Sequence, residues 1–202
     1  LLTSGSMVVI YAHVYRNLSY HPVHDLLPVV QIANVPLTLV VGPGVPSSVV
    51  DVKSYLAWVR SNPAHANIGT PAAGNITDFL AFLLARSAGL QLQQIAYKGG
   101  APAVQDLLGG QIPALINQLT EVLPHLASGK LRVLAVTSQQ RISFLPDVPT
   151  FAEQGHPTVI GSEWIGLFAR PGTAQRQVER MATGMRAALQ TPAVREALDT
   201  LA

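Results

Sequence analysis

Short apolar runs alternate with amphipathic stretches along most of the chain, and turns containing Gly or Pro separate them. This alternation is typical of α/β folds, in which helices connect mostly parallel strands. The candidate strands are the apolar runs at residues 29–33, 37–41, 66–69, 93–97, 112–116, 133–137 and 165–169. We therefore expect an α/β fold with a largely parallel sheet.

The composition of the 202 residues excludes several other classes of protein. With 49% hydrophobic residues and a net charge of only +2, the chain is too apolar to remain disordered. Its basic residues form no cluster, so no nucleic-acid partner is expected. The strongest apolar stretch, residues 35–41, contains Pro36 and stops at Gly42. A membrane-spanning helix needs ~20 apolar residues, so we expect no direct membrane insertion.

Two predicted helices have recognisable starts. Ser48 precedes an apolar pattern with helical spacing, and Asp51 stands three residues later in the capping-box position. Asn75 and Asp78 repeat this arrangement, and Gly89 supplies the stop of the second helix. Two further helices are predicted from Pro102, as a first helical residue, to Gly109, and over residues 174–189.

Two shifts in composition suggest domain boundaries. A stretch rich in Gly and Pro at residues 42–46 follows one candidate strand, and a similar stretch at 155–161 precedes another. The strand and helix units between them predict one α/β lobe over residues 44–161. Residues 1–43 and 162–202 would then form part of a first, discontinuous lobe. A chain that leaves one lobe and returns to it is typical of a two-lobed binding protein with a hinge of crossing strands.

The residue types that catalysis requires are missing or poorly spaced. Without Cys, a thiol nucleophile and Cys-based metal sites are impossible. The six His residues include no pair at i, i+4, and the chain has no Gly-x-Ser-x-Gly elbow. Counting residues leaves open a Ser-His-Asp triad assembled in space. We expect a protein that is not an enzyme, with no catalytic residue, no metal site and no cofactor.

A loop of small residues connects a predicted strand to the helix that starts at Asn75. Backbone N–H groups and the positive end of the helix dipole at such a start are suited to a carboxylate. Thr70, Asn75 and Thr77 can add side-chain donors. Alternatively, Asn75 and Thr77 only cap the helix. Asp78 would lower the affinity for an anion unless its side chain points away.

A second predicted strand meets a helix start at residues 97–102, where Gly99 and Gly100 let a ligand approach the backbone closely. Lys98 could attract an anion there or could be a solvated turn residue. Open α/β sheets bind ligands beyond the carboxyl ends of their strands, so two such helix starts in one lobe are more informative than one. Asn117 follows another predicted strand, and it either adds an amide at the same edge or starts a turn.

The longest motif is the run Tyr-Lys-Gly-Gly-Ala-Pro-Ala-Val-Gln-Asp-Leu-Leu-Gly-Gly-Gln from Tyr97 to Gln111. Further segments belong to the same pattern, at residues 20–25, 28–29, 124–125, 128–137, 145–150, 153–155, 164, 166–167 and 171–173. Together they closely resemble the Bug/TctC family, the periplasmic solute receptors of tripartite tricarboxylate transporters. The resemblance covers essentially the whole chain.

This resemblance implies a periplasmic-binding-protein-like fold (type II, Venus-flytrap), present here as one nearly complete lobe plus part of the second. It implies a receptor that captures a small carboxylated solute (a dicarboxylate, tricarboxylate, aromatic acid or amino acid) for the membrane permease subunits of the transporter. A ligand-sensing module of a signalling pathway that uses the same clamp is the alternative. The expected location is the periplasm, with a signal peptide upstream of Leu1. Relatives extend beyond both Leu1 and Ala202, so we expect a fragment of a longer receptor.

In this family, backbone amides and small hydroxyls in loops at helix starts hold the ligand carboxylate, often through water. The matching positions include the two loops described above and add a third in the first lobe. The expected ligand-binding residues are Ser4, Gly5, Ser6, Thr70, Gly74, Asn75, Ile76, Thr77, Gly99, Gly100, Ala101 and Asn117. Many relatives have Asp at the position of Asn117, so the substitution predicts a preference for plain carboxylic acids over amine-bearing ligands.

Overall fold

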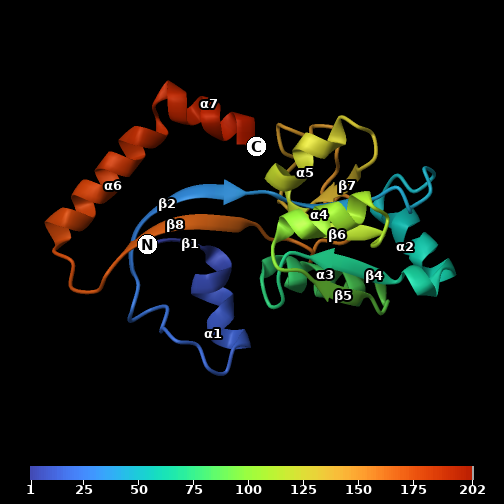
Figure 1. Ribbon diagram of the computed structural model, residues 1–202, viewed down its shortest axis with the longest axis horizontal. Helices are drawn as coiled ribbons and strands as arrows, with labels where there is room; N and C mark the ends of the chain where they lie inside the picture. Colours follow the sequence, from blue (N-terminus) through green and yellow to red (C-terminus); the bar gives the residue numbers. More distant parts are fainter. Residues whose placement is uncertain (202) are drawn as a thin grey trace. The chain divides into compact units, whose positions relative to one another are not determined.

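The computed structural model describes residues 1–201; within the last helix, the side chains at positions 197 and 199–201 lie outside the description. The chain divides into two compact units, one formed by Leu1–Val35 with the chain from Glu163 onward, and the other by Pro36–Ser162. Figure 1 shows their helices and strands, coloured along the chain. The first division falls before the strand at 37–41, because that strand hydrogen-bonds within the second unit.

The second unit contains a five-stranded sheet in the order β5-β4-β6-β3-β7. Its strands are β3 (Leu37–Val41), β4 (Asn67–Thr70), β5 (Gln93–Ala96), β6 (Ala114–Gln118) and β7 (Arg132–Val136). β4 runs parallel to β5 and β6, whereas β3 is antiparallel to both β6 and β7. The strands β4, β5, β6 and β7 therefore run in one direction, as the expectation of a largely parallel sheet has it, and β3 alone runs the opposite way. A strand that is buried on both faces, as β3 is, appears as a continuous apolar run in either direction.

Helices cover both faces of this sheet. Helices α2 and α3 form one core with Leu37 and Leu39 of β3, and helices α4 and α5 form the other with Val40 and with Leu115 of β6. Successive side chains of a strand point to opposite faces, so one strand contributes to both cores. The helices are α2 (Val52–Ser61), the short 3-10 helix η2 (Pro63–His65), α3 (Ile76–Ala88), α4 (Gly100–Leu108) and α5 (Leu119–Leu126).

The helix ends test the capping predictions. Asn75 is the N-cap of α3, as predicted, and Gly89 ends that helix in the left-handed conformation (φ 60°). Helix α2 instead begins after Asp51, which forms a reciprocal capping box with Ser54. The prediction of Ser48 as a cap is therefore wrong, because the capping box that forms lies three residues further along the chain.

The first unit contains a three-stranded antiparallel sheet in the order β1-β8-β2. Helix α6 packs against β2, and Val178 and Ala182 are its buried residues. The sequence pattern missed β1, which is too short to form an apolar run. The elements are β1 (Leu2–Ser4), the π-helix η1 (Ser6–Ile10), α1 (Tyr11–Val14), β2 (Leu27–Val35), β8 (Glu163–Ala169), α6 (Gln175–Leu189) and α7 (Pro192–Leu201). Among the described residues, no helix is long and apolar enough to cross a membrane.

Candidate functional site

The carboxyl ends of β4, β5 and β6 lie at one edge of the five-stranded sheet, because these three strands run in the same direction. Two backbone hydrogen bonds join the loops that follow β4 and β5. The Tyr97 N–H donates to the Thr70 carbonyl over 2.9 Å, and the Gly99 N–H donates to the Pro71 carbonyl over 2.8 Å. The second unit thus brings the starts of α3 and α4 together, beside Asn117 at the end of β6.

The loop before α3 uses its polar side chains for capping. The Oδ1 of Asn75 accepts hydrogen bonds from the Asp78 backbone N–H over 3.1 Å and from the Thr77 hydroxyl over 2.7 Å. The side chain of Ile76 packs against the core formed with α2 and α3. The Thr77 hydroxyl and the Asn75 side-chain oxygen therefore cap the helix, as in the alternative in which these residues only cap it. The Nδ2 donor of Asn75 takes part in neither of these two bonds.

The carboxylate of Asp78 points into this loop rather than away from it. It accepts hydrogen bonds from the Gly74 backbone N–H over 2.9 Å and from the Thr70 hydroxyl over 3.3 Å. Thr70 and Gly74 were expected to donate to a ligand, so a resident carboxylate already uses two of the expected donors. An acidic side chain in the first turn also offsets the positive end of the helix dipole.

The start of α4 differs from the prediction, because the helix begins at Gly100 and not at Pro102. Gly99 precedes it with φ 116°, a conformation that favours glycine. Gly100 is buried, and a Cβ at this position would overlap the carboxylate of Glu121. Ala101 is exposed in the first turn of the helix.

Asn117 is fully buried in β6, and its Nδ2 donates to the Oε2 of Glu121 over 3.0 Å. The Oδ1 of Asn117 has no hydrogen-bond partner among the described residues. Sequence reasoning missed Glu121. The available signal was its position in the first turn of α5, four residues after Asn117. Asn117 lacks the carboxylate that an Asp would have at this position, but the carboxylate of Glu121 lies beside it.

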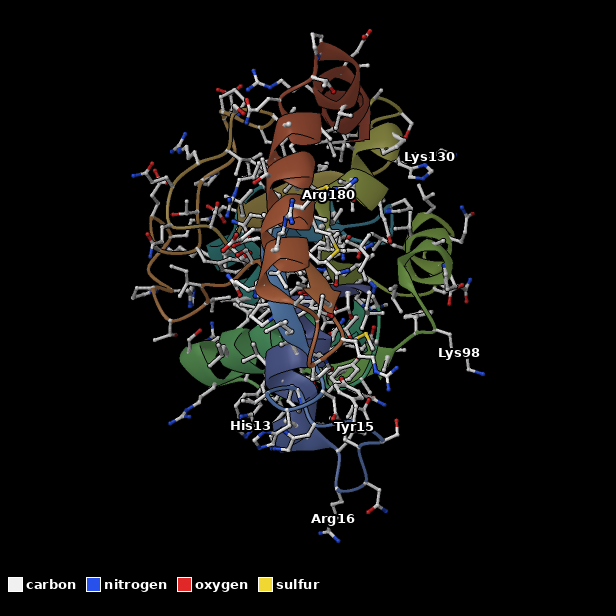
Figure 2. All side chains as sticks on the ribbon, turned by 90° about the vertical axis from the view of Figure 1, so that its left-hand side faces the viewer. His13, Tyr15, Arg16, Lys98, Lys130 and Arg180 are labelled. Atoms are coloured by element: carbon white, nitrogen blue, oxygen red, sulfur yellow. The ribbon has the colours of Figure 1, made fainter. Side chains whose placement is uncertain are left out.

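Lys98 and Tyr97 also lie near the start of α4. Lys98 is exposed, and Figure 2 shows its side chain projecting outward from the loop, which fits a solvated turn residue. The hydroxyl of Tyr97 donates to the Asp106 carboxylate over 2.9 Å. Burial first, and then the bond to Asp106, raises the pKa of Tyr97 to about 12, so this phenol is neutral at physiological pH.

Of the three expected residues of the first unit, Ser6 faces a resident carboxylate. The backbone N–H and the hydroxyl of Ser6 donate to Glu163 over 3.1 and 2.5 Å. Glu163 is only 5% exposed, and it also accepts from the backbone N–H of Trp164. Gly5 lies against the indole of Trp164, where a Cβ would overlap the ring. Ser4, the last residue of β1, pairs with Ile165 of β8.

Helix starts and a buried amide gathered beyond the carboxyl ends of strands are where α/β proteins bind small polar ligands. The fold and this site define a binding protein of the α/β class. The chain belongs to the TctC family, described as the tripartite tricarboxylate transporter family receptor, whose family model matches residues 1–201.

The chain is similar to several proteins along nearly its whole length. BugT of Bordetella pertussis is 34% identical over 197 residues, which cover 98% of this chain and 60% of BugT. The solved structure of R. palustris Rpa4515 with adipate is 30% identical and has a TM-score of 0.91. The match covers 99% of this chain and 66% of that protein. MatC from Rhodopseudomonas palustris with bound malate is 26% identical and has a TM-score of 0.82. The match covers 99% of this chain and 67% of MatC. The chain thus spans about three fifths of BugT.

These similarities test the expectations from the sequence. The resemblance to the Bug/TctC family is confirmed, and so is the α/β fold of periplasmic binding proteins, of which this chain is a part. The family consists of solute-binding receptors and not of enzymes. The expected ligand-binding residues and the lobe limits stay predictions.

Proposed function

We propose that the whole protein is a periplasmic receptor that captures a small carboxylated organic solute and delivers it to the permease subunits of a tripartite tricarboxylate transporter. The observation that carries this proposal is the meeting of two helix starts and a buried Asn amide at one edge of the sheet. Both helix starts direct backbone N–H groups and a positive dipole end toward that edge. A carboxylate is the small anion that such donors suit.

The adipate and malate bound to two relatives support a carboxylated ligand, since both are dicarboxylates. In this chain, Asn75 and Asn117 carry amide groups at that edge, and the expected residues of both loops surround them. Ser4, Gly5 and Ser6 in the first unit belong to the same proposal as expected ligand-binding residues. A signal peptide upstream of Leu1 also belongs to it, because delivery to a membrane permease from outside the cytoplasm requires export.

A ligand panel tests the function on the whole protein. Thermal unfolding is measured with succinate, malate, adipate, citrate, aspartate and benzoate, and with glucose and putrescine as uncharged and cationic controls. A ligand at about 100 times its Kd stabilises the folded state by about 2.7 kcal/mol, which raises the melting temperature measurably. We expect at least one acid to do so and both controls to have no effect. Absence of stabilisation by every acid would overturn the proposal.

A further inference from the structure

The space beside Gly100, the first residue of α4, can hold a carboxylate. Gly100 lacks the Cβ that would fill it, and the helix start supplies a positive dipole end. Asn117, with no exposed surface, directs its Nδ2 donor at the same position. A glycine, a helix start and a buried amide donor together provide the space, the electrostatic potential and the hydrogen bond that a carboxylate oxygen needs.

Glu121 occupies this position in the structure. Its Oε2 accepts from Asn117 over 3.0 Å and lies where the Cβ of an alanine at position 100 would be. Among the described side chains, no Lys or Arg lies within ion-pair distance of Glu121. The hydrogen bond from the Asn117 amide therefore holds this carboxylate without help from a cation. Glu121 is half-buried, so its side chain has a path outward to solvent.

The carboxamide of Asn117 shows why Glu121 does not leave without a replacement. Its Oδ1 is buried and has no partner among the described residues, so the bond from Nδ2 to Glu121 is what keeps the side chain partly satisfied. A buried amide that loses its acceptor is destabilising. Another carboxylate oxygen arriving at the same place would satisfy Asn117 again, and a ligand group with a donor could also satisfy Oδ1.

We infer that Glu121 is a built-in occupant of the carboxylate position at the start of α4, and that a ligand carboxylate binds there by replacing it. This inference rests on the proposed function. Two carboxylates at one helix start repel each other and compete for the same donor, so they exclude each other. Glu121 thereby lowers the affinity of the receptor for its acid and limits binding to ligands that can displace it.

Isothermal titration of the whole protein with adipate and with malate tests the inference. The variants are Glu121→Ala, which empties the position, and Glu121→Gln, which keeps the shape and removes the charge. Asp147→Ala is the matched control, because it removes an exposed carboxylate from a loop of the same unit. We expect Glu121→Ala to lower the Kd about tenfold, since a charge-assisted hydrogen bond no longer has to be displaced. Glu121→Gln should give a smaller decrease, and Asp147→Ala should leave the Kd unchanged.

The outcomes separate this inference from the proposed function. An unchanged or raised Kd for Glu121→Ala, while the wild type binds, overturns the inference and leaves the receptor function standing. If Glu121→Ala does not fold, weaker binding in Glu121→Gln overturns the inference in its place, because the near-isosteric variant preserves the packing. If neither the wild type nor any variant binds any acid of the panel, the proposed function fails instead.

Discussion

The starts of α3 and α4 lie at the same edge of one sheet, yet carboxylates from different parts of the chain lie against them. Asn75 and Asp78, both within the first turn of α3 or just before it, cap that helix. The start of α4 has no side-chain cap from its own sequence and lies against Glu121 of α5 instead. A local cap is visible in the order of residues, whereas the contact of Gly100 with a neighbouring helix exists only after the sheet has assembled.

Substitution of Gly100 tests the contact with Glu121 and should have the largest effect on stability. In Gly100→Ala, the new Cβ displaces the Glu121 carboxylate and leaves the buried Asn117 amide without its acceptor. We expect a loss of about 2 kcal/mol in the free energy of unfolding, measured by urea denaturation. In the Glu121→Ala background the same change should cost much less, because the hydrogen bond is already absent. Equal costs in both backgrounds would contradict the contact.

The local cap gives the next largest effect. Asn75→Ala removes the acceptor for the Asp78 N–H and the Thr77 hydroxyl, so α3 should lose about 1 kcal/mol of stability. Ser48→Ala is the control, since Ser48 is exposed and lies outside the capping box of α2. Urea unfolding should place it within about 0.5 kcal/mol of the wild type. A larger loss for Ser48→Ala than for Asn75→Ala would reverse the assignment of caps.

The smallest effect concerns Tyr97, in the loop before α4, and appears only at alkaline pH. Folding raises the pKa of Tyr97 above its ordinary value of 10.0, to about 12, through burial and the bond to Asp106. The folded state therefore favours the protonated phenol, so this contribution to stability is complete below about pH 10 and is lost as the pH rises toward 12.

Urea unfolding of the wild type and of Tyr97→Phe at pH 9 and pH 11 measures this contribution. The wild type should lose more stability between the two pH values than the variant does. Tyr55, whose pKa burial also raises, is present in both proteins, so the difference between them isolates Tyr97. The same alkaline loss in both proteins would show that the Tyr97 phenol does not contribute.

The sequence predicted the elements of the second unit well where the signal was local. The predicted strand at 37–41 matches β3 at both ends, and α3 ends at Gly89 as predicted. The start of α4 was predicted wrongly, and nothing in the sequence predicted that β3 would run against the other strands. Burial makes a strand apolar whichever way it runs, and Pro102 fits anywhere in a first helical turn, so neither pattern could decide between alternatives.

The candidate site shows the same division. The residue order was enough to select the loops at Thr70–Thr77 and Gly99–Ala101, since small residues between a strand and a helix predict exposed N–H groups. It did not show that the carboxylates of Asp78, Glu121 and Glu163 would accept hydrogen bonds from the residues expected to bind the ligand. Glu163 lies 157 residues from Ser6, and only the pairing of β1 with β8 brings them together.

By itself, the sequence determined the fold class and the family and indicated two helix starts as candidate anion sites, because each depends on short patterns of residues along the chain. Only the tertiary structure decided which carboxylate occupies each of those starts. Hydrogen bonds of buried groups depend on distance in space, and residues such as Gly100 and Glu121 become neighbours only when α4 and α5 pack on one face of the sheet.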